Sequence, residues 1–319
     1  MYSTPDTSRV FKEELKSLWT ISNLGEACFC ISITISRDRL KRTISISQTA
    51  LIDRIVQQFG QSEADPISTP MDPSVAKSLV WPLPSDPPLS DDNTHVLACL
   101  PFRSLIGSLM YLAIGTQPDI SFAVACLCQL LNCYQHAHWS ATIWVVCYLK
   151  GTRLLALTLG SDPELDLIGF SDSLYADCLV AMRSTMGYCF SVGSAIFTWS
   201  SCHQKMVTNS SCKAEYIALS EASCKALWLW QFLREVHFLK PSPTIVLCNN
   251  NGAKSLSSDP THHSHSKHID VHHHFVREHV EDGSIAIWHV PGHDNVADIF
   301  MKALPCPDFT CLCPFLGLW

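Results

Sequence analysis

The sequence predicts an α/β protein whose C-terminal half forms a mixed five-stranded sheet flanked by helices. An α+β segment and a helical block precede this sheet. Two observations support the fold class. The elements expected between residues 166 and 303 follow the order three strands, helix, strand, helices, strand, helix. Residues 101–152 are strongly apolar with helical spacing. A length of 319 residues fits two or three compact units.

The first 60 residues contain the elements of a small α+β unit. Phe11–Leu18 has helical spacing, and Gln48–Phe59 has the pattern of an amphipathic helix. Cys28–Ser36 alternates and is rich in β-branched residues, so we predict a strand there, with Arg42–Ile46 as its partner. The following stretch, Pro66–Asp92, contains seven prolines and has the composition of a surface linker.

A helical block follows this linker. We expect helices over Arg103–Ile114, Ile120–Tyr134 and Trp139–Lys150, and Gly151 is expected to end the last of them. Apolar helices of this kind usually pack against one another or against a neighbouring domain.

The C-terminal half alternates between strand and helix patterns. Strands are expected over Asp166–Asp172, Ser184–Val192, Ala195–Ser200, Thr244–Asn249 and Ser284–Val290. Helices are expected over Ser211–Val236, Asn251–Leu256, Lys267–Val280 and Asp294–Ala303. Three consecutive strands favour antiparallel hairpins, and the helical crossovers then add parallel strands.

The composition is that of a folded protein. Hydrophobic residues make up 47% of the chain and charged residues 16%, which excludes a disordered chain. The net charge of −7 disfavours a strongly basic nucleic-acid-binding protein, although a local basic groove stays open. No apolar run reaches about 18 residues, so no membrane span is expected. Met1–Lys12 lacks the apolar core of a secretory signal. We therefore expect an intracellular protein, in the cytoplasm or nucleus, that is not secreted.

The sixteen cysteines are scattered along the chain. Most lie inside apolar runs, as do Cys126, Cys128, Cys147 and Cys189. We expect reduced, buried thiols that pack as small hydrophobic side chains, rather than a disulfide framework.

Four positions, three of them acidic, could lie together at one edge of the predicted sheet. Asp172 ends the first strand, and Glu215 lies in the first turns of the long helix. Asn249 ends the fourth strand, and Asp298 lies on the last helix. Taken alone, an acid at a strand end is usually a solvated cap, and a glutamate on a helix is usually a surface charge. Converging carboxylates, however, are the ligands that Mg²⁺ prefers, and two such ions about 4 Å apart support phosphodiester cleavage.

The sequence also contains several longer runs that point to a known family. In chain order they are ISNLGEACFCISITISRD (Ile21–Asp38), STPMDP (Ser68–Pro73), FRSLIGSLMYLAIGTQPDISFAV (Phe102–Val124), YLKGT (Tyr148–Thr152), RSTMGYCF (Arg183–Phe190), AEYIALSEA (Ala214–Ala222), KHIDVHHHFVRE (Lys267–Glu278) and ADIFMKALP (Ala297–Pro305). With these runs the chain resembles the C-terminal part of the Pol polyprotein of copia-type (Pseudoviridae-like) retrotransposons. The resemblance spans about Phe11 to Pro305 and covers the end of the reverse transcriptase and the whole ribonuclease H domain.

The resemblance implies a domain order and a substrate. We expect a thumb-like reverse-transcriptase remnant over residues 1–65, a Pro/Ser-rich linker over 66–98, a helical connection region over 99–160, a ribonuclease H-like domain over 161–305 and a short tail over 306–319. The implied substrate is the RNA strand of an RNA/DNA hybrid, recognised through phosphates, 2′-hydroxyls and groove shape. The implied cofactor is Mg²⁺ or Mn²⁺.

By this resemblance, Asp172, Glu215 and Asp298 match three metal-binding carboxylates of the family. The fourth is an aspartate in a CDN run, where this chain has Cys248, Asn249 and Asn250. An amide offers one neutral oxygen and is a poor Mg²⁺ ligand. Because such residues act as a unit, we predict that hydrolysis is weak or lost.

Other departures from the family pattern support this prediction. Lys213 stands where the family usually has an acid, Tyr175 replaces a usual tryptophan, and Gln117 replaces a usual arginine. The sequence contains no YVDD-like paired-aspartate run of a polymerase palm, and the pair Asp91–Asp92 lies in the Pro/Ser-rich stretch. We therefore expect no DNA synthesis by this chain alone, and we expect upstream Pol domains as partners.

Ten of the fifteen histidines lie between His262 and His293. His268 and His272 have the i, i+4 spacing of a helical metal chelate. The resemblance already accounts for His268 and His274, so we favour a structural or incidental role. His293, just before the last helix, is a candidate for assisting product release or water activation.

The run LWLWQF (Leu227–Phe232) lies on the long helix. Because its neighbours in the sequence are apolar, we predict core and domain-contact surface rather than a base-stacking platform.

Three functions stay open at this point. The first is a ribonuclease H remnant with impaired hydrolysis, and the second is a non-catalytic nucleic-acid-binding relic of a transposable element. The third and weaker one is a His-rich metal-binding protein.

Overall fold

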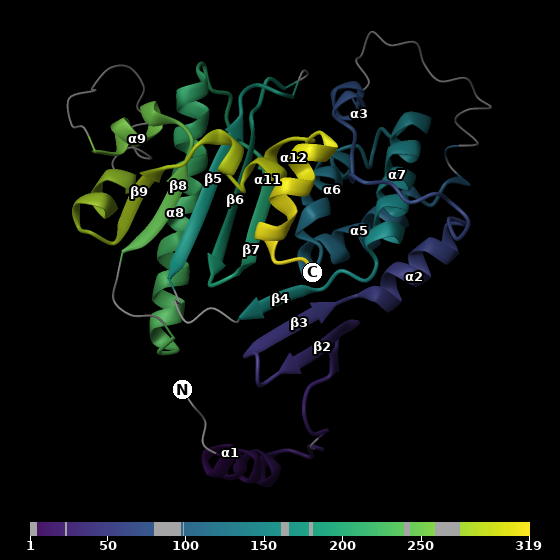
Figure 1. Ribbon diagram of the computed structural model, residues 1–319, viewed down its shortest axis with the longest axis vertical. Helices are drawn as coiled ribbons and strands as arrows, with labels where there is room; N and C mark the ends of the chain where they lie inside the picture. The colour runs from purple at the N-terminus through teal and green to yellow at the C-terminus, as the bar shows by residue number, and fades with distance from the viewer. Residues whose placement is uncertain are drawn as a thin grey trace.

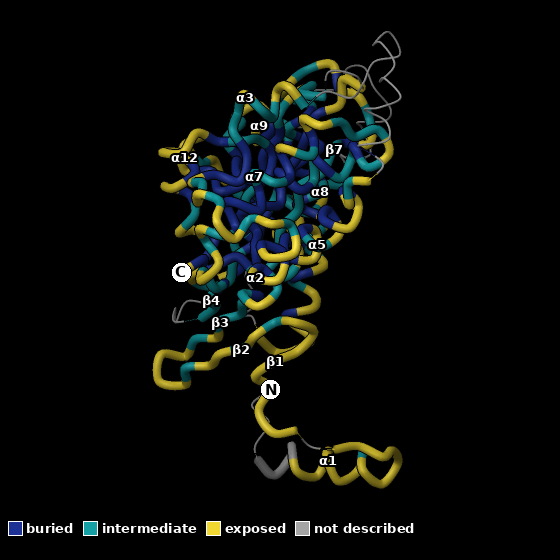
Figure 2. Tube along the Cα trace, turned by 90° about the vertical axis from the view of Figure 1, so that its right-hand side faces the viewer, coloured by how far each residue is buried: buried dark blue, intermediate teal, exposed yellow. Residues whose placement is uncertain are grey.

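The computed structural model describes residues 5–22, 24–79, 97, 99–160, 166–178, 181–238, 243–258 and 275–319. In these ranges two sheets and a helical block pack together, and helix α1 (Pro5–Leu18) stands apart from them (Figure 1). The buried residues concentrate in the helical block and the C-terminal sheet, whereas α1 and the first strands are largely exposed (Figure 2).

The N-terminal strands form an antiparallel sheet of four. Its order is β1 (Phe29–Cys30), β2 (Ile33–Asp38), β3 (Thr43–Ser47) and β4 (Leu157–Gly160). The predicted partner strand is confirmed as β3, but the predicted single strand over Cys28–Ser36 is wrong. The chain reverses at Ile31 and Ser32, whose φ angles of 50° and 60° lie in the left-handed region that a two-residue hairpin turn requires.

Strand β4 connects the N-terminal sheet to the end of the chain. Leu157 pairs with Ile46 of β3. Ala156 and Trp319 exchange two backbone hydrogen bonds of 2.8 and 3.1 Å. Residues 306–319, which we predict as a tail, are thus folded onto the molecule as α12 (Cys306–Leu312) and a 3₁₀ turn, η3 (Cys313–Leu316).

The helical block consists of five elements. They are α2 (Thr49–Gln58), α5 (Phe102–Gly115), the 3₁₀ turn η1 (Pro118–Ile120), α6 (Ser121–Cys128) and α7 (His136–Thr152). The predictions for α2, α5 and α7 are confirmed, although Gly151 lies inside α7 rather than ending it. The helix predicted to reach Tyr134 ends at Cys128, and the Tyr134 hydroxyl instead donates a hydrogen bond of 2.7 Å to the Leu97 carbonyl.

The first part of the Pro/Ser-rich stretch packs against the helical block. Residues 73–78 form helix α3 (Pro73–Ser78), Met71 is buried, and the Trp144 indole donates a hydrogen bond of 2.8 Å to the Thr69 carbonyl. Residues 80–96, including Asp91 and Asp92, lie outside the described residues.

The C-terminal half forms the predicted mixed sheet of five strands. The strands are β5 (Leu167–Leu174), β6 (Thr185–Val192), β7 (Ala195–His203), β8 (Thr244–Cys248) and β9 (Ile285–His289), in the order β7-β6-β5-β8-β9. β5, β6 and β7 are antiparallel, whereas β8 and β9 join in parallel. The predicted mixed sheet, with three antiparallel strands followed by two parallel ones, is confirmed.

Helices cover both faces of this sheet. Helix α8 (Ser211–Glu235) packs on one face through Leu219, Ala226 and Leu229. The short helix α11 (Asp298–Met301) and the helical block pack on the other (Figure 1). α11 lies very close to the sheet, because a Cβ on Gly187 of β6 would stand 2.6 Å from the Cβ of Phe300.

The last predicted helix, over Asp294–Ala303, is wrong in its extent. The chain forms a 3₁₀ turn, η2 (Gly292–Asp294), and then only the four residues of α11, because Lys302 has extended backbone angles. Helix α9 (Asn251–Ser258) is present as predicted. The predicted helix over Lys267–Val280 is described only from residue 275, and residues 275–281 are helical.

The run LWLWQF is only partly core. Leu229 is 2% exposed and packs on the sheet, but Trp228 and Phe232 face solvent, with exposed fractions of 56% and 47%. The prediction that the aromatic neighbours are apolar is also wrong, because Lys225 lies over the Trp228 ring at 4.4 Å. The three-residue spacing between Lys225 and Trp228, nearly one helix turn, brings a residue from outside the run onto its exposed face.

A buried carboxyl lies inside the helical block. Asp119 of η1 is 1% exposed and accepts a hydrogen bond of 2.5 Å from the Tyr148 hydroxyl. Burial raises the pKa of Asp119 from 3.8 to about 6. Gln117, two residues before Asp119, is fully buried. Its side-chain amide atoms have no hydrogen-bond partner among the described residues.

Replacing Gly187 tests the close contact of α11. Gly187→Ala should lower the free energy of unfolding by about 1–3 kcal/mol, because the new methyl overlaps Phe300. Gly107→Ala is the matched control. Nothing lies within 4 Å of its added Cβ in α5, so it should raise stability by about 0.5–1 kcal/mol. Urea unfolding of both variants measures the difference, and equal effects would contradict this packing.

Asp119 should make stability depend on pH. Its folded-state pKa is raised, so the native state binds the proton more tightly, and the free energy of unfolding falls as pH rises from about 4 to 6. The loss is on the order of 3 kcal/mol. Asp119→Asn should remove this slope and raise stability above pH 6. The difference between variant and unmodified chain in urea unfolding across this range isolates the effect, and an unchanged slope would contradict it.

Candidate functional site

The sheet and its helices deliver the predicted acids to one place. Asp172 lies near the end of β5, and Asn249 directly follows β8, whose Cys248 pairs with Ser171. Glu215 lies in the second turn of α8, and Asp298 is the first residue of α11. Carboxyl ends of parallel strands meet at one sheet edge, which explains the position of Asp172 beside Asn249.

Asp172 is the centre of a hydrogen-bond network. Its side chain is buried, and its Oδ2 accepts hydrogen bonds from the amide nitrogens of Asn249 (3.0 Å) and Asn295 (3.2 Å). Its Oδ1 accepts from the backbone N–H of Ser173 (2.8 Å). Asn295 also donates to the Ser171 carbonyl at 3.1 Å. The β5 carboxylate is therefore held by neutral donors from two later segments of the chain.

The three acids lie close enough to influence one another. Burial raises the pKa of Asp172 far above its usual range, and a hydrogen bond with Asp298 and the charge of Glu215 raise it further. Burial likewise raises the pKa of Glu215, and hydrogen bonds with Asp172 and Ser173 oppose this shift. The structure thus brings Asp172, Glu215 and Asp298 together in one acidic cluster.

A cation of the chain itself reaches this cluster. Lys302 Nζ lies 2.8 Å from Asp298 Oδ2. Asp298 and Ser173 are both buried, with exposed fractions of 9% and 7%. The ammonium group compensates part of the negative charge of the acidic cluster.

His293 does not join the acidic cluster. It is on the surface, and its Nε2 lies 3.3 Å from Asp294 Oδ2. The adjacent Gly292 borders Asn249, since a Cβ there would lie 3.9 Å from the Asn249 amide nitrogen. His268, His272 and His274 lie outside the described residues.

The sequence prediction missed Asn295 and Lys302. Lys302 had a usable signal, because an acid followed by a lysine four residues later pairs on a helix. Asn295 had none, because only the packing of η2 against β5 turns its amide toward Asp172.

The acidic cluster does not fit a pair of divalent cations. No three His, Cys, Asp or Glu side chains of the described ranges are arranged to hold a metal ion. The donor chemistry gives the reason. Amide nitrogens occupy Asp172 Oδ2, Lys302 occupies Asp298 Oδ2, and Asn249 presents a donor where a hard cation needs an oxygen.

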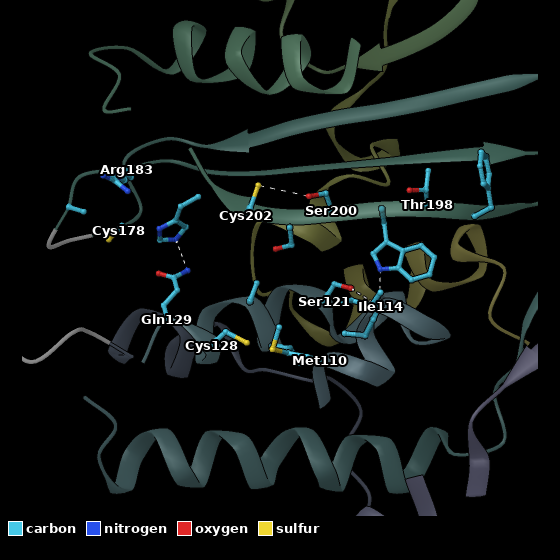
Figure 3. A pocket seen from close by; sticks show the side chains of 18 residues that line it. Met110, Ile114, Ser121, Cys128, Gln129, Cys178, Arg183, Thr198, Ser200 and Cys202 are labelled. Atoms are coloured by element: carbon cyan, nitrogen blue, oxygen red, sulfur yellow. Dashed lines mark hydrogen bonds between the residues drawn. The ribbon is translucent and has the colours of Figure 1, made fainter. Parts of the chain in front are cut away.

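A cavity of about 810 Å³ lies elsewhere, between α5, α6 and β7 (Figure 3). Its wall includes Trp199, whose indole donates to the Ala113 carbonyl at 2.9 Å. Gln129 and His203 form a hydrogen bond of 3.2 Å at its other end. No carboxylate lines it, so this cavity is separate from the acidic cluster.

The chain is similar in sequence to Pol polyproteins of plant retrotransposons. The chain is 32% identical over 308 residues to the retrovirus-related Pol polyprotein from transposon TNT 1-94 of Nicotiana tabacum, and 33% identical over 270 residues to that from transposon RE1 of Arabidopsis thaliana. These matches cover 96% and 85% of the chain but only 23% and 18% of the relatives. An uncharacterized mitochondrial protein of A. thaliana is 31% identical, with 67% of this chain and 83% of that protein covered.

The chain is therefore a retrotransposon Pol sequence. It belongs to the copia-type Pol polyproteins and corresponds to their C-terminal reverse transcriptase and ribonuclease H part. No protein-family model matches it.

Solved structures show weaker likeness. An N-terminal RNase H domain from Mycobacterium tuberculosis is 13% identical, covers 47% of this chain and 96% of that chain, and has a TM-score of 0.32. A foamy viral protease-reverse transcriptase in complex with an RNA/DNA hybrid is 12% identical, covers 68% of this chain and 28% of that chain, and has a TM-score of 0.38. Across the described ranges, none of the helices has the length and apolarity to cross a bilayer.

Two substitutions of Asp172 test its hydrogen-bond network. Because the raised pKa keeps Asp172 protonated at pH 7, Asp172→Asn exchanges one neutral side chain for another and keeps an oxygen for the amide donors, so stability should change by less than about 1 kcal/mol. Asp172→Ala removes an acceptor from both amides and leaves Asn295 with only the Ser171 carbonyl, so it should lower stability by about 2–3 kcal/mol. Urea unfolding measures both, and an equal stability loss in Asp172→Asn would contradict the network.

Proposed function

We propose that the C-terminal domain is a ribonuclease H derived from a retrotransposon, with the RNA strand of an RNA/DNA hybrid as its ancestral substrate and weak or lost hydrolysis in this chain. The observation that carries the proposal is the hydrogen bond from the Asn249 amide nitrogen to Asp172 Oδ2. A carboxylate at position 249 would accept rather than donate at this point and would add a negative charge.

The charge around Asp172 supports this proposal. A divalent cation is attracted by uncompensated carboxylate oxygens. Here Asn249 and Asn295 donate to Asp172, and Lys302 pairs with Asp298. The acidic cluster therefore attracts Mg²⁺ or Mn²⁺ less than a set of four carboxylates would.

The second candidate is a non-catalytic relic that still binds nucleic acid. Recognition of a hybrid depends on its phosphates, 2′-hydroxyls and shape, so it does not require the missing carboxylate. The confirmed five-stranded fold supports this alternative, because the fold persists while the acidic cluster has changed. Upstream Pol domains as partners, an intracellular location and the domain boundaries given above are part of the same proposal.

Restoring the carboxylate tests the proposal. Asn249→Asp should raise the rate of Mg²⁺- or Mn²⁺-dependent cleavage of a labelled RNA/DNA hybrid by about 10²-fold or more, because the ligands act as a unit. Asn250→Asp is the matched control. It adds the same charge one residue later, where the side-chain oxygen keeps its hydrogen bond from the Ala253 N–H. This control should leave the rate unchanged.

Cleavage of the same hybrid by the unmodified chain can contradict the proposal. Robust cleavage that Asp172→Asn abolishes would contradict weak hydrolysis. If Asn249→Asp gains no activity but the chain binds the hybrid in a filter assay, the non-catalytic alternative is favoured.

A further inference from the structure

Helix α8 carries an aromatic stripe on its solvent side. The rings of Trp228 and Phe232 stack at a centroid distance of 5.5 Å and an interplanar angle of 1°. They are 56% and 47% exposed, whereas Leu229 and Leu233, which face the sheet, are buried. Monomeric proteins rarely expose neighbouring large aromatic side chains, and such patches mark interaction surfaces.

One side of α8, half-buried at Glu221 and Lys225 and exposed from Trp228 on, has the spacing of a coiled-coil seam. Glu221, Lys225, Trp228, Phe232 and Glu235 follow one another at intervals of four, three, four and three residues. Alternating intervals of three and four are those of heptad a and d positions, which lie along one line of a helix. We call these five residues the α8 seam.

The charges of the α8 seam select a partner. A basic residue, Lys225, precedes the aromatic pair, and an acidic one, Glu235, follows it. If a second α8 lies antiparallel across the seam, with the two-fold axis near residue 230, Lys225 faces Glu235 of the partner subunit. In the same register Trp228 faces Phe232 of the partner subunit.

Other registers satisfy fewer of these residues. If one helix slides by seven residues along the other, Lys225 lies opposite Trp228 of the partner subunit. Glu221 then lies opposite Phe232 of the partner subunit. In this register the aromatic rings no longer pair with each other, and Lys225 no longer faces Glu235 of the partner subunit. Only the register centred near residue 230 pairs aromatic with aromatic and acid with base.

We propose that the α8 seam is a homodimer interface, in which two copies of this chain pack α8 against α8 antiparallel around the Trp228 and Phe232 rings. The contact is isologous, so each pair of residues occurs twice. The acidic cluster lies toward the other end of the helix, where Glu215 is, and the contact leaves it accessible.

The surface area that the α8 seam can bury limits the affinity of the dimer. An aromatic side chain contributes about 150–250 Å² when fully buried, and these rings are about half exposed. The pairing therefore buries less than the 1,200–2,000 Å² of a standard stable interface. We expect a reversible dimer with a dissociation constant on the order of 10–100 μM.

A single-stranded nucleic acid is the other occupant to test. Bases stack on exposed aromatic rings beside cations, and Lys225 lies 4.4 Å from the Trp228 ring centroid. Glu221 and Glu235 flank the aromatic pair on the same stripe and would repel a phosphate chain. The charges thus favour a second copy.

A charge-swap experiment on the full chain tests the dimer. Sedimentation velocity over about 1–300 μM should show a concentration-dependent dimer for the unmodified chain. Lys225→Glu and Glu235→Lys should each weaken it at least about tenfold, because each places like charges opposite one another in both symmetric pairs. The double variant Lys225→Glu/Glu235→Lys should recover the dimer.

Controls keep the result specific. Lys205→Glu reverses a charge in the loop before α8 and should leave the dimer unchanged, and thermal unfolding at low concentration shows that each variant folds. A chain that stays monomeric throughout, or a double variant without recovery, would overturn the proposal. Loss of binding to a fluorescent single-stranded oligonucleotide in Trp228→Ala, with no dimer in the unmodified chain, would assign the seam to nucleic acid.

Discussion

The close approach of α11 to strand β6 positions the acidic cluster. Gly187 leaves room for Phe300 where any side chain would overlap it, so α11 lies directly on the sheet. Asp172 of β5 pairs with Gly187 across the ladder, and Asp298 begins α11. One contact therefore brings together two carboxyls that are 126 residues apart in the sequence. The helical block packs on the same elements, because Phe300 and Ile299 share a core with Leu127 and Val145.

The acidic cluster is stabilised from inside the protein. Neighbouring buried carboxyls repel each other when ionised. The amides of Asn249 and Asn295 and the ammonium group of Lys302 reduce this repulsion. Asn249 contributes to this stabilisation through its hydrogen bond to Asp172. The same hydrogen bond occupies Asp172 Oδ2, an oxygen that a bound cation would need as a ligand. Under the proposed function, in which Asn249 stands in place of a carboxylate, lower repulsion and lower cation affinity both follow from that one replacement.

The two halves of the chain support each other. Strand β4 extends the N-terminal sheet, and the end of the chain returns to hydrogen-bond beside it. The helical block lies between this sheet and α11 and buries apolar residues against both. One apolar core therefore extends from the helical block to α11, which carries Asp298. Helix α8, which carries the α8 seam, packs on the face of the sheet opposite α11.

The sequence by itself determined the element order, the five-stranded topology, the family and the three acids. Periodicity identifies long helices and strands, and short family runs place residues in register. The hairpin at Ile31 and Ser32 was not predictable, because neither residue is the glycine or asparagine that usually marks a left-handed turn. The four-residue length of α11 also escaped prediction, because the apolar pattern continues past its end.

Only the tertiary structure decided what each side chain faces. It turned the Asn295 amide toward Asp172, placed Lys302 on Asp298, and left Trp228 and Phe232 in solvent although their neighbours Leu229 and Leu233 are core. Side-chain type sets which interactions a residue can make. The packing of distant segments decides which of them it does make.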